Sequence, residues 1–139
     1  MSGGRLPALS RWRVAAIVWA SPASTLGLLI GALALLTGGR LQRVGRTLEF
    51  WGGLLPWCLS RVPIGGAAAA LTLGHVIIGQ NQAALTMSRA HEWIHVRQYE
   101  RWGPLFLPAY FACSAWLWVT GRHPYLDNPF EREAYERSD

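Results

Sequence analysis

A run of 24 residues without a charged side chain, residues 14–37, constrains this chain more than any other feature of its sequence. As a helix, the run is long enough to cross a hydrocarbon core about 30 Å thick. We therefore predict a basic leader over residues 1–13 and a retained membrane anchor helix over residues 14–37. The alternative is a cleaved signal peptide, but apolar residues resume at Leu26 and continue to Leu36, which a cleavage site would not need.

Two features inside this run bear on how the anchor is built. Pro22 predicts either one kinked helix or a shorter helix that starts at the proline. Gly27 and Gly31 have the spacing that lets two membrane helices approach closely, so a homo- or hetero-oligomer formed through this helix is one candidate assembly. Three arginines precede the run and three follow it, and the charges therefore leave its orientation open.

Charge and composition exclude several classes of protein. The 139 residues include 13 basic residues, all of them arginine, and eight acidic ones, for a formal net charge of +5. The arginines are scattered singly, which argues against nucleic-acid binding. A hydrophobic content of 51% excludes disorder. Cys58 and Cys113 are too far apart for a CxxC unit, and we expect free buried thiols rather than one disulfide.

Between residues 38 and 79 the apolar segments become short and are separated by prolines and glycines, which favours strands. These segments are residues 47–55 and 68–78, and residues 71–78 are the strongest candidate for a single strand. His75 lies within that strand. We interpret it as a hydrogen-bonded core residue rather than a metal ligand, because a lone histidine in an apolar strand is more often structural.

Helical patterns follow the strand region. Residues 83–102 predict a helix that stops at a Gly-Pro pair. Residues 105–120 are apolar but short for a membrane span, and the Trp and Tyr residues around them suit an interfacial helix at the lipid headgroups. A last helix to about residue 137 begins with Asn128 as its N-cap and Pro129 at its first position.

The helix over residues 83–102 contains the pattern HExxH, formed by His91, Glu92 and His95. Imidazoles at positions i and i+4 lie one turn apart on the same helix face, and this spacing suits one Zn²⁺ ion. Glu92, beside the first ligand, reaches a water molecule at the metal instead of the metal itself. It is therefore the candidate general base.

A catalytic zinc site also needs a third protein ligand. The extension HExxHxxGxxH is absent, because Gln98 and Arg101 occupy its last two fixed positions. The third ligand must come from further along the chain. The acidic and histidine candidates after His95 are Glu100, His123, Asp127, Glu131, Glu133 and Glu136.

These motifs resemble the gluzincin group of zinc metallopeptidases, in which a glutamate on a separate downstream helix completes the site, often as E-x-x-A-D. The segment Glu131-Arg132-Glu133-Ala134-Tyr135 is similar to that element. The resemblance implies Glu131 as the third zinc ligand, with Glu133 as the second candidate. Glu131 also stands three residues after Asn128, where a capping-box residue is the rival interpretation.

The chain departs from the gluzincin pattern at two places. Tyr135 stands where the usual Asp supports a zinc-bound histidine. Arg89 and Arg97 flank the motif where typical members carry uncharged or apolar residues. Residues 91–135 also resemble a small bacterial membrane-protein family that shares HExxH and NPFExEA, and this resemblance implies no particular substrate. Together with the apolar run it predicts a location in a bacterial inner membrane, with membrane lipid as a partner.

Together these patterns predict an α+β, mostly helical, minimal zincin-like fold in which residues 38–139 form one compact domain. The predicted function is hydrolysis of peptide bonds by a membrane-associated zinc metallopeptidase. Tyr135, His123 and Tyr125 are candidate donors to the developing oxyanion. By the same resemblance, residues 71–78 offer an edge to an extended peptide substrate. The alternatives are a non-catalytic membrane protein with a structural or vestigial zinc site, and an accessory subunit of a larger complex.

Overall fold

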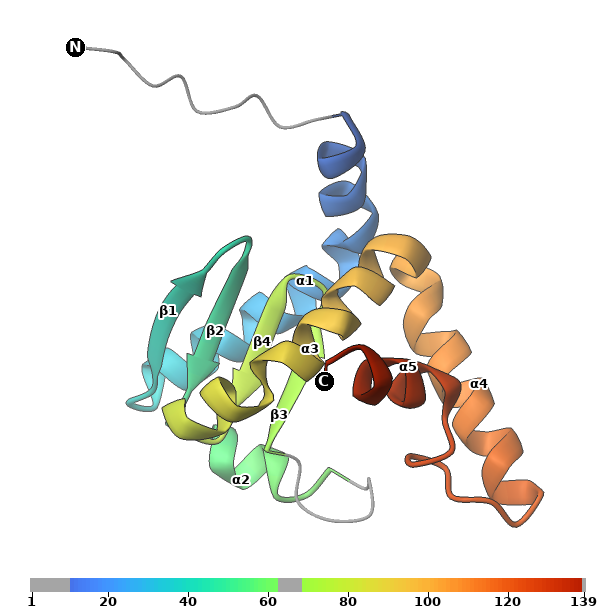
Figure 1. Ribbon diagram of the computed structural model, residues 1–139. Coiled ribbons are helices and arrows are strands. Elements are labelled where there is room, and N and C mark those ends of the chain that lie inside the picture. Colours follow the sequence, from blue (N-terminus) through green and yellow to red (C-terminus); the bar gives the residue numbers. More distant parts are fainter. Residues whose placement is uncertain (1–10, 63–68, 139) are drawn as a thin grey trace.

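A computed structural model describes residues 11–62 and 69–138 (Figure 1). The described part is α+β and 64% helical, with an N-terminal apolar helix and a small sheet, so the predicted fold class is confirmed. Residues 1–10 of the predicted leader and residue 68 of the predicted strand region lie outside it. The elements in chain order are α1 (Arg11–Leu36), β1 (Arg40–Val44), β2 (Thr47–Trp51), α2 (Leu55–Leu59), β3 (Ala70–Leu73), β4 (Val76–Gly79), α3 (Gln82–Trp102), the 3₁₀-helix η1 (Gly103–Leu105), α4 (Phe106–Val119) and α5 (Pro129–Arg137).

The four strands form one sheet in the order β1-β2-β4-β3. β1 pairs antiparallel with β2, β2 pairs parallel with β4, and β3 pairs antiparallel with β4. β3 and β1 are therefore the two edge strands. The predicted single strand over residues 71–78 is wrong, because the chain reverses at Gly74 and His75 to form the hairpin β3-β4. Gly74 has a φ of +64°, which favours glycine at this turn.

The second predicted strand segment, residues 47–55, is only partly a strand. β2 ends at Trp51, because Gly52 and Gly53 both have positive φ values of 78° and 56° and turn the chain into α2. β1 and α2 were not predicted, since neither has a long apolar run. The helices over residues 83–102 and 129–137 and the apolar helix near residues 105–120 are confirmed.

Two helical layers enclose the sheet. Val76 and Ile78 of β4 face α1 and α2 and belong to a core with Phe50, whereas Ile77 between them faces α3. Side chains alternate between the two faces of a strand, so β4 is apolar on both of them. Figure 1 shows α3 crossing in front of the sheet and α1 running behind it.

α1 is a continuous helix of 26 residues with Pro22 inside it, so the kinked-helix alternative applies and not the shorter helix. Among the described residues it is the one helix long and apolar enough to cross a membrane. Its length is about 39 Å at 1.5 Å per residue. Figure 1 shows the ribbon bending between its dark-blue first turns and its paler remainder.

One face of α1 is also packed against the sheet. The buried residues of that face are all small: Ala20, Ala23, Gly27, Gly31 and Ala34. A Cβ atom at Gly27 would lie 2.7 Å from Val76 Cβ, and one at Gly31 would lie 2.6 Å from the Phe50 ring. The close approach that these glycines allow is therefore used within the chain. The role of α1 as a membrane anchor stays a prediction.

The packing of α1 on the sheet can be tested with one substitution at two positions. Ala34 is fully buried in the core, and Ala32 is exposed on the opposite side of the helix. We expect Ala34→Leu to lower the free energy of unfolding by about 1–3 kcal/mol through overpacking. Ala32→Leu should change it by less than about 0.5 kcal/mol. Thermal unfolding in detergent, followed by circular dichroism, measures both, and equal effects would contradict this packing.

Candidate metal centre

The α3 helix is fixed on the sheet by a half-buried ion pair. Glu49 of β2 is fully buried. Arg89 of α3 donates to its carboxylate through Nε to Oε2 and through Nη2 to Oε1, both at 2.9 Å, and Gln42 Nε2 adds a bond of 2.7 Å to Oε1. Two parallel N–H donors match the carboxylate geometry. The flanking charge of Arg89 is thus neutralised at the sheet, and that of Arg97 is exposed.

The fold brings three side chains from two helices together. His91 and His95 lie one turn apart on α3, and Glu131 reaches them from α5. Glu131 Oε2 lies 3.0 Å from His91 Nε2 and 3.1 Å from His95 Nε2, and the two Nε2 atoms are 3.2 Å apart. In the part of the chain that the structure describes, this is the group of side chains whose ligand atoms could hold a metal ion.

The spacing and chemistry of these atoms fit zinc. In a tetrahedral site with bonds of about 2.0–2.1 Å, neighbouring ligand atoms lie about 3.3 Å apart. Each Nε2 carries at most one proton, so at most two of the three contacts are hydrogen bonds while the carboxylate is ionised. A divalent cation attracts all three lone pairs at once. Two imidazoles and one carboxylate are also a ligand set found in catalytic zinc sites.

Gln98, three residues after His95, fixes the orientation of that imidazole. Gln98 Nε2 donates to the Phe130 carbonyl at 2.9 Å and to Glu133 Oε1 at 3.2 Å. The carbonyl oxygen of the amide, Gln98 Oε1, therefore faces His95 and accepts a hydrogen bond of 2.8 Å from its Nδ1–H group. With the proton on Nδ1, the Nε2 atom keeps a lone pair for a metal.

The second oxygen of Glu131 is held by α4. Tyr110 Oη donates to Glu131 Oε1 at 2.8 Å, which leaves Oε2 to face the imidazoles. Asn128 accepts a hydrogen bond from the Phe130 N–H at 3.0 Å and is the N-cap of α5, as predicted. Its amide also donates to the Tyr110 carbonyl and to Ser114 Oγ. Both oxygens of Glu131 are engaged at this cluster, and the capping-box interpretation does not apply.

The electrostatics of the cluster favour a positive charge beside Glu131. Burial by itself would lower the pKa of His95, but the hydrogen bond with Glu131 and the charges of Glu92 and Glu131 outweigh it, and the pKa is raised. Burial would likewise raise the pKa of Glu131, yet its contacts with His91, His95 and Tyr110 lower it. A carboxylate that stabilises an imidazolium also stabilises a divalent cation at the same place.

Glu92 lies on α3 beside the first histidine and is buried. Its Oε2 atom accepts a hydrogen bond of 2.6 Å from Thr72 Oγ1 on the edge strand β3. It does not belong to the group of three residues that could hold a metal ion, and its role as a general base stays a prediction. Tyr99 Oη donates to the Thr72 carbonyl at 3.1 Å, so α3 already covers the sheet edge at this residue.

Of the three predicted oxyanion donors, Tyr125 and Tyr135 contact each other and His123 lies apart from them. The Tyr135 ring packs on His91, with ring centroids 4.3 Å apart, and its hydroxyl lies 3.0 Å from that of Tyr125. His91 Nδ1 is buried and has no hydrogen-bond partner among the described residues, so no carboxylate supports it. His123 is exposed in the α4–α5 loop, where its Nδ1 accepts from the backbone of Tyr125 and Leu126. His123 is therefore outside the cluster.

The remaining ligand candidates bind elsewhere. Glu133 accepts from Gln98, as described above, and does not join the histidines. Glu100 accepts from Arg46 at 2.6 Å and lies 3.3 Å from His75 Nε2. His75 is a buried turn residue, and the predicted hydrogen bonds of its ring nitrogens are not found among the described residues. Cys58 and Cys113 are free thiols and are half-buried.

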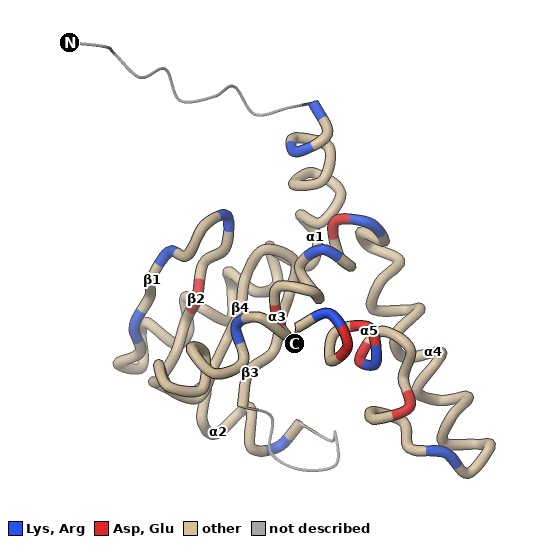
Figure 2. Tube along the Cα trace, viewed as in Figure 1, with Lys and Arg blue, Asp and Glu red and all other residues tan. Residues whose placement is uncertain are grey.

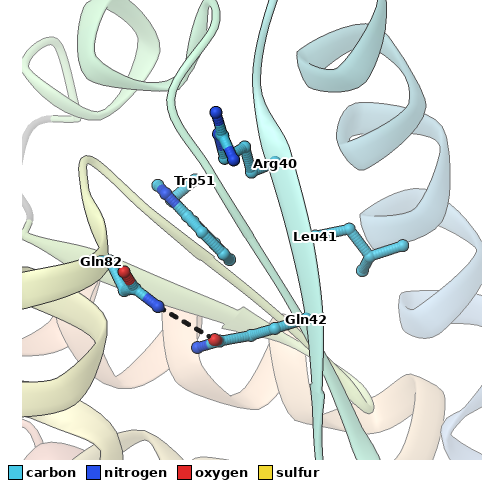
Figure 3. Close-up of a pocket in the computed structure, with 5 residues that line it drawn as sticks. All are labelled: Arg40, Leu41, Gln42, Trp51 and Gln82. Atoms are coloured by element: carbon cyan, nitrogen blue, oxygen red, sulfur yellow. Dashed lines mark hydrogen bonds between the residues drawn. The ribbon is translucent and has the colours of Figure 1, made fainter.

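A shallow hollow of about 640 Å³ lies away from the cluster, between the β1-β2 hairpin and the start of α3 (Figure 3). Gln82 Nε2 donates to Gln42 Oε1 across it at 3.2 Å. The hollow is lined by Arg40, Leu41, Gln42, Trp51 and Gln82. None of these residues belongs to the group formed by His91, His95 and Glu131, and the hollow is not part of the candidate centre.

Sequence reasoning did not single out Gln98 or Tyr110 as supports of the site. Gln98 was noted only because it replaces a glycine of a longer motif, although its position three residues after His95 places both on one helix face. Tyr110 gave no signal, because its contact with Glu131 spans 21 positions. Comparisons of the chain with family models, curated proteins and solved structures find no match.

Metal content tests which glutamate completes the cluster. We expect about one zinc ion per purified chain, because three ligands converge on one point. His95→Ala and Glu131→Ala should lose the ion, and Glu133→Ala, a matched change on the same helix, should retain it. Elemental analysis after dialysis against a weak chelator gives the number. Loss in Glu133→Ala with retention in Glu131→Ala would reverse the assignment.

The orienting role of Gln98 gives a second test. Gln98→Leu removes the acceptor of the His95 Nδ1 proton, and we expect zinc affinity to fall about 10–100-fold. The double variant Gln98→Glu, Glu133→Gln restores an acceptor for His95 without placing two carboxylates 3.2 Å apart, and it should recover most of the affinity. Competition with a fluorescent chelator measures both variants. An unchanged affinity in Gln98→Leu would show that this hydrogen bond does not orient the ligand.

Proposed function

We propose that this protein is a membrane-associated, zinc-dependent hydrolase of peptide bonds, similar in its site to gluzincin metallopeptidases. The observation that carries the proposal is the triangle of His91 Nε2, His95 Nε2 and Glu131 Oε2, with sides of 3.0–3.2 Å. The two histidines lie on α3, the helix that also bears Glu92. Three protein ligands are what a catalytic zinc site uses, since the fourth position is kept for water or substrate.

Each group of the site has a separate task in this proposal. Zinc held by the three ligands supplies Lewis acidity, polarising the substrate carbonyl and lowering the pKa of a water molecule. Glu92 takes a proton from the attacking water, whose oxygen forms the new bond to the carbonyl carbon. The C–N bond then breaks, and Glu92 returns its proton to the leaving nitrogen. Thr72 holds one oxygen of Glu92 and orients the carboxylate.

Tyr135 and Tyr125 are the candidate oxyanion donors near the cluster. Their hydroxyls share one hydrogen bond of 3.0 Å, and the Tyr135 ring rests on His91. One phenol can donate to the other and the second to a developing oxyanion, so the pair offers one free donor. His123 does not take this role, since its Nδ1 is engaged with the loop backbone.

The proposed location is a bacterial inner membrane, with α1 as the membrane anchor. The support is its length and the many large apolar side chains on the face turned away from the sheet. Substrate would then reach the site from water or from the membrane surface.

A structural zinc site in a non-catalytic protein is the second candidate function. One observation favours it: the three ligand side chains are only 7–14% exposed, and the Tyr135 ring packs on the most exposed of them, His91. Structural zinc sites are closed, whereas catalytic ones keep an open position. The two candidates differ in whether Glu92 matters for turnover.

Replacement of the general base distinguishes these two functions. We expect Glu92→Gln to keep its zinc and to lose peptide cleavage by about 10²–10⁴-fold, because the amide cannot accept the proton. Glu100→Gln, on the same helix but paired with Arg46, should retain activity. Cleavage of a peptide mixture is followed by mass spectrometry beside zinc analysis. Fully zinc-loaded wild type that cleaves nothing would favour the structural site.

A further inference from the structure

The α4 helix exposes apolar side chains that no other described part of the chain covers. Residues 103–121 contain no charged residue, and Figure 2 shows α4 without acidic or basic positions along its length. Only Phe106 and Leu117 are buried in this helix. Phe111, Trp116 and Trp118 are 62%, 70% and 74% exposed. Contiguous apolar surface of this kind marks a contact site rather than a solvated face.

The opposite, inner face of α4 packs against the candidate metal centre. Phe106, Tyr110 and Ser114 are four residues apart and therefore line one side of the helix. Phe106 packs near His95, with ring centroids 6.3 Å apart, and Tyr110 donates to Glu131 Oε1. Ser114 Oγ accepts from Asn128 at the start of α5. One helix thus carries the uncovered apolar surface and the groups that position a candidate ligand.

Several observations identify the occupant of the outer face as lipid. α4 begins against α1, where Phe106 packs with Ala20 and Ala23 and where Trp19 Nε1 donates to the Arg101 carbonyl at 3.3 Å. The uncovered surface of α4 therefore adjoins the helix suited to a membrane. A protein partner needs one complementary stripe, whereas α4 is apolar over all of its outer sides.

The length and ends of α4 suit the membrane interface. Fourteen residues reach about 21 Å, which is too short to cross a hydrocarbon core of about 30 Å. Trp116 and Trp118 lie near the end of the helix, and Arg122 follows it, in the pattern typical of side chains at the headgroup level. The helix is therefore suited to lie in one leaflet.

We propose that α4 docks into the lipid bilayer through its outer face and thereby holds Tyr110 against Glu131, so that contact with lipid stabilises the metal centre. The lipid contact is independent of the proposed hydrolase function. The stabilisation of the metal centre rests on the proposed function, because it requires Glu131 to be a zinc ligand.

The lipid contact is tested first, on the full chain in nanodiscs of phosphatidylcholine and phosphatidylglycerol. In a Cys58→Ser, Cys113→Ser background, a spin label is attached to Ala112→Cys on the exposed side of α4 or to Arg97→Cys, an exposed position of α3. We expect the label at position 112 to collide with oxygen more than with a water-soluble nickel chelate, and the label at 97 to show the reverse. A nickel-accessible label at 112 overturns the proposal. So does a label that neither reagent reaches, since protein would then cover α4.

The effect on the metal is tested by zinc affinity in the same nanodiscs. Ala112→Glu places a charge on the lipid-facing side, and Ala112→Leu is its apolar control. We expect Ala112→Glu to raise the zinc Kd about tenfold and Ala112→Leu to leave it unchanged, because loss of support for a ligand has effects of this size. Tyr110→Phe should also raise the Kd about tenfold.

The double variant separates this coupling from general destabilisation. If the outer face acts through Tyr110, adding Ala112→Glu to Tyr110→Phe weakens zinc binding no further. Fully additive effects, or an unchanged Kd in Ala112→Glu, overturn the coupling. If wild type binds no zinc, the proposed metal site fails, and the spin-label result still decides the lipid contact.

Discussion

The carboxylate of Glu131 is buried where three helices meet, and the arrangement of those helices depends on it. A buried carboxylate without partners is strongly destabilising, so its surroundings must supply compensating donors or charge. Here α3 supplies two imidazoles and α4 supplies the Tyr110 hydroxyl. Asn128, at the start of the same short helix, bonds to α4 as well. The candidate metal centre is therefore also the polar junction of the helical half of the molecule.

The sheet gives this junction a rigid support. Its two faces take different partners: small residues of α1 approach one side closely, and α3 packs on the other through Ile77, Leu85 and Val96. Polar contacts add direction to this packing. Arg89, two residues before the first histidine, pairs with Glu49 of the sheet. Glu92, one residue after that histidine, accepts a hydrogen bond from Thr72. The sheet thus restrains the HExxH segment just before its first residue and at its second residue.

The apolar surfaces and the polar cluster share their supporting elements. α1 meets the start of α4 through Ala20, Ala23 and Phe106, and Phe106 in turn packs with Tyr99 and Phe130 around the cluster. A bilayer in contact with α1 and α4 would therefore also constrain the packing of α3 and α5, the helices that carry the candidate ligands. This arrangement suits a site that works at a membrane surface, because substrate and lipid would approach neighbouring parts of the fold.

The sequence by itself determined the features that depend on local pattern. The apolar length of α1, the helical spacing of His91 and His95 and the Asn128 cap follow from short-range geometry, and the structure has each of them. The prediction of one strand over residues 71–78 was wrong, because a hairpin of two apolar strands has the same composition as one strand. One glycine with positive φ, Gly74, decides between them. Only the tertiary structure decided that Glu131, rather than Glu133, meets the histidines and that Gln98 and Tyr110 support them. Those choices depend on how α4 and α5 pack against α3, and contacts between residues far apart in the chain leave no periodicity in the sequence.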